Sequence, residues 1–217
     1  MAVKEARQGY EKSEATRAAI IAAGHRFFGA QGFNGATTRA IAEAAGVALP
    51  AIAYHFGGKE GLYLACAEDI LSRYYAETGA LATQALTALS EEPGEAVCRD
   101  YLRRILKQLL RVFVQPDAGD YRADFVTREL RDRGPAFQRL CEGLWLPGVD
   151  LVARLVAGVK GRAGMADDQV DALMLISSLL AFNTGRDVTL RILGLDRFDA
   201  DAFSRLDAAI DRLVAGI

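Results

Sequence analysis

The stretch TTRAIAEAAGVALPAIAYHFGGKE, residues 37–60, decides how the N-terminal part of the chain folds. Apolar residues recur at helical spacing on both sides of Gly46-Val47, which predicts two short helices joined by a tight turn. A glycine placed just after the last apolar position tolerates the left-handed conformation that stops a helix. This is the sequence pattern of a helix-turn-helix, which places one short helix in the major groove of DNA.

Within this stretch, the residues are expected to cap a helix, to face the core or to face a binding partner. Thr37 or Thr38 is expected to cap the first helix, since a hydroxyl accepts a bond from a free N–H in the first turn. Pro50 suits the first turn of the second helix, where its missing N–H removes no hydrogen bond. The predicted inward residues are Ile41, Ala42, Ala45, Val47, Ile52 and Phe56, and those left facing a partner are Pro50, Ala51, Tyr54 and His55. The turn alone leaves a helical hairpin in an ordinary core as the alternative.

The composition is that of a globular chain with a substantial core, because 51% of its 217 residues are hydrophobic. No apolar run approaches the roughly 18–20 residues of a membrane span, so no membrane partner is expected. The start, MAVKEARQGYEKSEATR, is polar and lacks the apolar stretch of a secretion signal. These features predict a cytoplasmic protein.

The charge is distributed unevenly along the chain. Residues 1–60 hold seven Lys/Arg and five Asp/Glu, a net charge of +2, whereas residues 61–217 hold 19 and 23, a net charge of −4. The sign of this asymmetry suits a DNA-binding head on a neutral-to-acidic body. Affinity for DNA is then expected to depend on phosphate contacts and to fall as salt rises.

The sequence predicts neither a metal site nor an enzyme, and no cofactor. Cys66, Cys98 and Cys141 are widely spaced, and His25 and His55 are too far apart to form a local metal motif. Buried reduced thiols are the expected state of the cysteines, with redox sensing as the alternative. The chain also lacks the GxSxG, HExxH, P-loop and dinucleotide-binding patterns of common enzyme classes.

Nearly every segment has a helical pattern, and the alternation typical of strands is absent, which predicts an all-α fold of about nine or ten helices. A frayed arm is expected over residues 1–12. Beyond the helix-turn-helix, helices are expected over about 13–30, 59–89, 95–114, 121–131, 136–159 with a kink at Pro147, 167–193 and 199–214. We expect residues 1–60 to be the DNA-binding domain and residues 61–217 a helical effector-binding and dimerisation domain.

The segment VDALMLISSLLAF, Val170 to Phe182, is apolar on nearly all sides. A helix of this kind must be covered all round. One side is expected to pack on its own core. Another side, together with the final helix, is expected to meet a second subunit. A central helix in a monomer is the alternative.

The run GFNGATTRAIAEAAGVALPAIAYHFGGKEGLY, Gly32 to Tyr63, resembles the DNA-binding signature of the TetR family of bacterial transcriptional regulators. The run AIAYHFGGKEGLYLA, together with the later RELRDRGPAF, is similar to the CecR-like subgroup. The chain departs from the family pattern in two places. It has Ala48 where many members have Ser or Thr, and Pro50 where many have Gly. Ala48 therefore has no hydroxyl with which to cap the second helix or touch a phosphate.

The resemblance implies a ligand-responsive transcriptional regulator. It implies a repressor that binds a palindromic operator on double-stranded DNA as a homodimer, paired through its last two long helices. A small, mostly apolar effector is expected to release it from DNA. The alternatives are a transcriptional activator and a helical protein-interaction module that does not bind DNA.

Candidate site residues follow from this reading. Thr38, Arg39 and Lys59 are expected on phosphates, and Pro50, Ala51, Tyr54 and His55 at or near base edges or backbone. The predicted DNA-contact set is Thr37, Thr38, Arg39, Ala48, Leu49, Pro50, Ala51, Tyr54, His55 and Lys59. The alternative for Tyr54 is a packed core aromatic, and for Lys59 a solvated cap. Candidate effector-lining residues, each with ordinary core as its alternative, are Phe113, Phe125, Phe137, Trp145 and Asn183.

Overall fold

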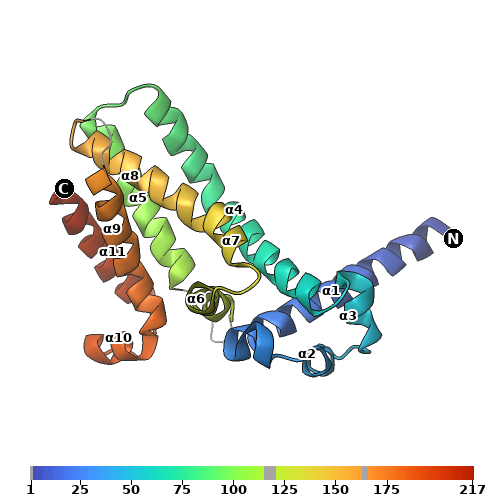
Figure 1. Ribbon diagram of the computed structural model, residues 1–217. Helices are drawn as coiled ribbons and strands as arrows, with labels where there is room; N and C mark the ends of the chain where they lie inside the picture. The colour runs from blue at the N-terminus through green and yellow to red at the C-terminus, as the bar shows by residue number, and fades with distance from the viewer. Residues whose placement is uncertain (1, 115–120, 163–165) are drawn as a thin grey trace. The chain divides into compact units, whose positions relative to one another are not determined.

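The computed structural model describes residues 2–114, 121–162 and 166–217, with side chains from residue 10 onward. These residues form helices and no strand, which confirms the all-α prediction (Figure 1). In chain order the helices are α1 (Ala2–Gly35), α2 (Thr38–Ala44), α3 (Pro50–Phe56), α4 (Lys59–Ser90), α5 (Glu95–Phe113), α6 (Arg122–Asp132), α7 (Phe137–Leu140), the π-helical turn η1 (Cys141–Trp145), α8 (Leu146–Val159), α9 (Ala166–Thr184), α10 (Arg186–Leu193) and α11 (Ala200–Ala215). Within the described ranges, no helix is both long and apolar enough to span a bilayer.

The chain forms two compact units. The first consists of the described residues of Met1–Ser72 and Gly119–Cys141, and the second of those of Arg73–Ala118 and Glu142–Ile217. Helix α4 begins in the first unit and ends in the second, whereas α6 belongs wholly to the first. The functional division into residues 1–60 and 61–217 stays a prediction. As a structural unit, the N-terminal part also includes the start of α4 and the segment containing α6.

An aromatic cluster forms the core of the first unit. Phe28 of α1, Tyr63 of α4 and Phe125 of α6 are almost completely buried. The Tyr63 ring centroid lies 4.7 Å from that of Phe28 and 4.6 Å from that of Phe125. The inward stripe of α1 was expected at Ile20, Ala23 and Phe27, but Phe27 is half-buried and Phe28 takes its place. Phe28 completes the four-residue spacing that begins at Ile20, so it lies on the side of α1 that faces α4 and α6.

Helix α1 differs from expectation at both of its ends. The expected frayed arm is wrong for residues 2–12, because they continue the helix without an interruption. At the other end, Gly32 breaks the helix as expected, with φ 73° and ψ 177°, after which the chain turns helical again as far as Gly35. Only a glycine adopts this backbone conformation without strain.

Polar contacts hold α6 in the first unit. The Glu129 carboxylate, 1% exposed, accepts hydrogen bonds from the Tyr63 hydroxyl and from the Ala136 backbone N–H, the latter at 2.7 Å. Burial, together with the bond to Glu129, raises the pKa of Tyr63 far above its ordinary value. Arg128 donates to the carbonyl oxygens of Gly29 and Ala30, each at 2.8 Å. Contacts from α4, α1 and the turn after α6 therefore fix this helix.

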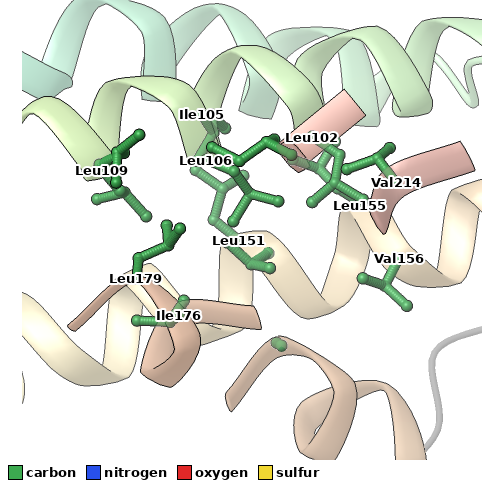
Figure 2. Close-up of a cluster of buried hydrophobic side chains, with 14 of the residues drawn as sticks. Leu102, Ile105, Leu106, Leu109, Leu151, Leu155, Val156, Ile176, Leu179 and Val214 are labelled. Carbon is green, nitrogen blue, oxygen red and sulfur yellow. The ribbon is translucent and has the colours of Figure 1, made fainter. Parts of the chain in front are cut away.

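The second unit is built around an aliphatic core shared by α5, α8, α9 and α11 (Figure 2). The expected apolar side of α5 is confirmed by the burial of Leu102, Ile105, Leu106 and Leu109, while Val112 is half-buried. Leu151, Leu155, Val156, Ile176, Leu179 and Val214 complete the side chains labelled in Figure 2. Each α-helix supplies one apolar stripe to this core, as expected for a helical bundle.

Two expected long helices are irregular or divided. The helix expected over residues 136–159 contains a π-helical turn directly before α8, and Pro147 lies in the first turn of α8, where it is tolerated; the expected kink at this residue stays a prediction. The single helix expected over residues 167–193 is wrong. Gly185, at φ −107° and ψ 33°, separates α9 from α10. A glycine weakens a helix at such a point because it has more backbone freedom to lose than other residues. The last helix is confirmed, with Asp199 as its cap.

Substitution at Gly134 tests whether the hydrogen-bonded position of the Glu129 carboxylate stabilises the fold. Gly134→Ala should lower the free energy of unfolding by about 1–3 kcal/mol, because the buried carboxylate would be pushed from its donors. The added Cβ would lie only 2.5 Å from Glu129 Oε2. Chemical denaturation measures the change. Gly79→Ala, in α4 with no neighbouring atom within 4 Å of the new Cβ, is the control and should be neutral or slightly stabilising. Equal stability of Gly134→Ala and the natural chain would contradict the expected crowding.

Candidate DNA-binding site

Helices α2 and α3 form the helix-turn-helix that the sequence predicted. The Thr37 hydroxyl accepts a hydrogen bond from the Ala40 backbone N–H at 3.2 Å, which caps α2. Gly46 adopts the left-handed conformation at φ 67° in the turn, and Pro50 opens α3. Gly57, at φ 74°, then ends α3. Local signals within about twenty residues therefore set both the start and the stop of this motif.

The inward side of the motif is fixed by a small apolar contact set. Ile41, Ala42 and Ile52 are buried as predicted. The other residues expected to face inward, Ala45, Val47 and Phe56, are half-buried. Because α3 has only seven residues, this packing rather than helix propensity holds it in position.

The outward side of α3 is free of the core. Tyr54 is 83% exposed, which excludes the packed-aromatic alternative. Its ring lies against His55 in an edge-to-face arrangement, with centroids 5.0 Å apart. None of the ten predicted DNA-contact residues is buried: Thr37, Arg39, Ala48, Leu49, Pro50 and Tyr54 are exposed, and Thr38, Ala51, His55 and Lys59 are half-buried. The whole set is therefore available to a partner.

Lys59, at the start of α4, is held in a defined position. Its ammonium donates to the Asn34 carbonyl at 3.4 Å and lies 4.8 Å from the centroid of the Phe33 ring. Both partners follow the break at Gly32. The sequence did not suggest these contacts, because the residues involved are 25 positions apart. They localise one positive charge beside the helix-turn-helix.

A partly buried network of polar contacts links α1, α4 and α6 within the same unit. His25 is 3% exposed, and its Nε2 lies 3.0 Å from Asp69 Oδ2, while Arg122 Nε lies 3.1 Å from the same oxygen. The bond to His25 and then the bond to Arg122 lower the pKa of Asp69 to about 2. The sequence predicts that His25 does not form a local metal motif with His55, and it predicts no other role for this residue. The one sequence feature that points to a role for His25 in the core is its position on the inward side of α1, between Ile21 and Phe28.

The five candidate effector-lining residues are divided between the two units. Phe125 and Phe137 belong to the first unit, and Phe113, Trp145 and Asn183 to the second. Phe125 is packed among Phe28, Tyr63 and His25, so the core accounts for it. Among these residues, the Asn183 amide donates a 2.5 Å hydrogen bond to the Phe113 carbonyl. The other assignments stay predictions.

An open groove lies between α5 and α11 in the second unit. It is lined by Arg111, Ala200, Phe203, Ser204 and Asp207. Arg111 donates to both carboxylate oxygens of Asp207, at 3.1 and 2.6 Å. None of the five candidate effector-lining residues is among the residues that line this groove.

Comparisons with known proteins agree with this geometry. Residues 20–66 match the family model of bacterial regulatory proteins of the TetR family, and residues 98–217 match that of the C-terminal domain of the HTH-type transcriptional dual regulator CecR. The chain is 32% identical over 197 residues to CecR of Shigella flexneri, covering 88% of this chain and 85% of that protein.

Solved structures show the same fold at lower identity. AibR in complex with isovaleryl coenzyme A and operator DNA is similar with a TM-score of 0.58 and 15% identity, over 78% of this chain and 86% of that one. FadR of Bacillus subtilis in complex with stearoyl-CoA is similar with a TM-score of 0.57 and 16% identity, over 92% and 98%.

The chain belongs to the TetR family of bacterial transcriptional regulators and, within it, carries the CecR C-terminal domain. This confirms the resemblance seen in residues 32–63 and in RELRDRGPAF.

The Asp69 network gives a pH-dependent prediction. A carboxylate with a lowered folded-state pKa stabilises the fold above its unfolded pKa of about 3.9, and this contribution is lost as pH falls towards 2. Asp69→Asn should therefore reduce the free energy of unfolding by about 1–2 kcal/mol at neutral pH, and the difference should shrink below about pH 4. Urea denaturation at several pH values measures it. Asp150→Asn, at an exposed ion pair, should change little at any pH. A constant difference for Asp69→Asn across this range would argue against the network.

Proposed function

We propose that this regulator is a ligand-responsive repressor that binds a palindromic operator as a homodimer and is released by a small, mostly apolar effector. The observation that carries the DNA-binding part is the outward side of α3, where Tyr54 is 83% exposed on a helix whose other side is packed in place. We expect the protein to act in the cytoplasm, where bacterial DNA lies.

The chemistry of the outward side suits DNA. Ala48, Pro50 and Ala51 are small, so they allow close approach and apolar contact with thymine methyl groups. Tyr54 and His55 add a ring and polar atoms at base edges or backbone. Phosphate contacts would come from Thr38, Arg39 and Lys59, supported by the exposure of Arg39 and the fixed position of Lys59.

A homodimer is supported by an apolar stripe on α9. Val170, Leu173 and Met174 are 57%, 48% and 70% exposed, at the i, i+3 and i+4 spacing that places them on one side of the helix. On α11, Leu213 is 51% exposed. Two-fold pairing through α9 and α11 would bury these side chains, and it would present two copies of α3 to a palindromic site.

The effector is proposed to bind in the second unit and to act through α4. This helix runs without interruption from Lys59 in the first unit to Ser90 in the second. A ligand that binds one arrangement of the helices better than another shifts the population towards it. AibR and FadR are described with coenzyme A esters, and the acyl chain of such a ligand agrees with a mostly apolar effector.

Activation of transcription is the second candidate, because the relative from Shigella flexneri is named a dual regulator. A reporter gene placed behind the operator that the protein binds separates the two roles. Repression predicts higher expression when the regulator gene is deleted, whereas activation predicts lower expression.

Selection of bound fragments from sheared genomic DNA tests the proposal as a whole. The purified protein at near-physiological salt should enrich fragments that share an inverted repeat, and higher salt should weaken their binding. A folded dimer that enriches no sequence would contradict operator binding and would favour a protein-interaction module instead.

Lys59→Ala tests the phosphate role. Binding to all sequences should weaken by a similar factor, and the slope of log affinity against log salt should flatten by about one unit per lost contact. Fluorescence anisotropy with the selected operator measures both quantities. Arg73→Ala, which removes an exposed charge further along α4, is the control and should leave the slope unchanged. An unchanged slope for Lys59→Ala would show that its ammonium only holds the end of α1.

Met174→Glu tests the dimer surface. A carboxylate in the centre of an apolar interface is strongly unfavourable, so the variant should sediment mainly as a monomer at micromolar concentration and should bind the operator more than tenfold more weakly. Ile192→Glu is a matched control, because Ile192 is 77% exposed but lies on α10. It should remain dimeric. A dimeric Met174→Glu would place the interface elsewhere.

A further inference from the structure

The N-terminal turns of α1 continue beyond the core of the first unit (Figure 1). Ile20 is fully buried, but each of the ten residues from Tyr10 to Ala19 is exposed or half-buried. Tyr10 itself is 69% exposed. Helices without tertiary packing are marginal in water, so this stretch gains little stability from its own chain.

One residue of this stretch is fixed against the DNA-binding motif. The Arg17 guanidinium lies over the ring of Phe56, the last residue of α3, 5.5 Å from the ring centroid. A cation over an aromatic ring is held by the ring quadrupole while its N–H groups stay free for another partner. Arg17 is exposed, and no carboxylate in the described part of the chain pairs with it.

The contact places the Arg17 charge at the C-terminal end of α3, beside the residues of its outward side. His55 and Phe56 have ring centroids 6.1 Å apart, and Tyr54 and His55 have centroids 5.0 Å apart. Phe56, which holds the Arg17 charge, thus lies next to the two rings of the outward side. Once α3 lies in a major groove, a cation at its C-terminal end is placed near the flanking phosphates.

We propose that Arg17 is a phosphate-binding residue, positioned by Phe56, through which α1 extends the DNA contact beyond the helix-turn-helix. This inference rests on the proposed function. The guanidinium is suited to the task because its planar array of donors matches two phosphate oxygens. The contact carries no sequence information, so it should strengthen binding to every DNA fragment alike.

The test compares three forms of the full chain on the selected operator. Arg17→Ala should weaken binding about tenfold at low salt and flatten the slope of log affinity against log salt by about one unit per subunit. Arg17→Lys, which retains the charge, should keep most of the slope. The matched control is Arg26→Ala, because Arg26 is an exposed arginine on the same helix that lies 5.9 Å from the centroid of the Phe27 ring. It should behave like the natural chain.

The salt slope separates this role from a purely structural one. If Arg17 only fastens α1 to α3, Arg17→Ala would lower the melting temperature while leaving the slope unchanged, which would overturn the inference. Equal slopes for Arg17→Ala and Arg26→Ala would do the same. Failure of the natural chain to enrich any operator would instead overturn the proposed function, and this inference with it.

Discussion

The buried carboxylate of Glu129 is the constraint on which the first unit depends. A charge removed from water requires hydrogen-bond donors, and here they come from Tyr63 in α4 and from the backbone of Ala136 beyond α6. A different placement of α6 would leave the carboxylate unpaired. Because α6 also holds α1 through Arg128, it links α4 to the helix against which α2 packs. The support of the helix-turn-helix thus includes a contact between residues 66 positions apart.

The helix-turn-helix could be predicted almost completely from the sequence because its signals are local. The Thr37 cap, the left-handed Gly46 and the opening Pro50 act within a few residues of one another. The place of α6 could not be predicted, since it depends on contacts such as that from Arg128 to Gly29, which no periodicity reveals. Effector-lining residues cannot be told from core residues by side-chain type, since an aromatic ring such as Phe125 serves equally well in a core.

The two units use exposed apolar residues in different ways. On α3, the exposed Tyr54 ring and the neighbouring His55 stand beside small residues, which gives a narrow surface. On α9, branched and long side chains repeat along one side of a helix, which gives an extended surface suited to another helix. The charged residues also differ between the two units. Lys59 is held beside α3, whereas Lys107 and Arg111 on α5 are paired with Asp211 and Asp207 on α11.

The π-helical turn at Cys141–Trp145 bears on how chains of this kind vary in length. A π turn accommodates one residue more than an α-helical turn, and it confines that extra residue to a local bulge. The helix beyond it keeps the same side towards its neighbours, so Leu151 and Leu155 remain in the core. A related chain that is shorter by one residue at this point could therefore form a regular α-helix there and still bury the same side of α8.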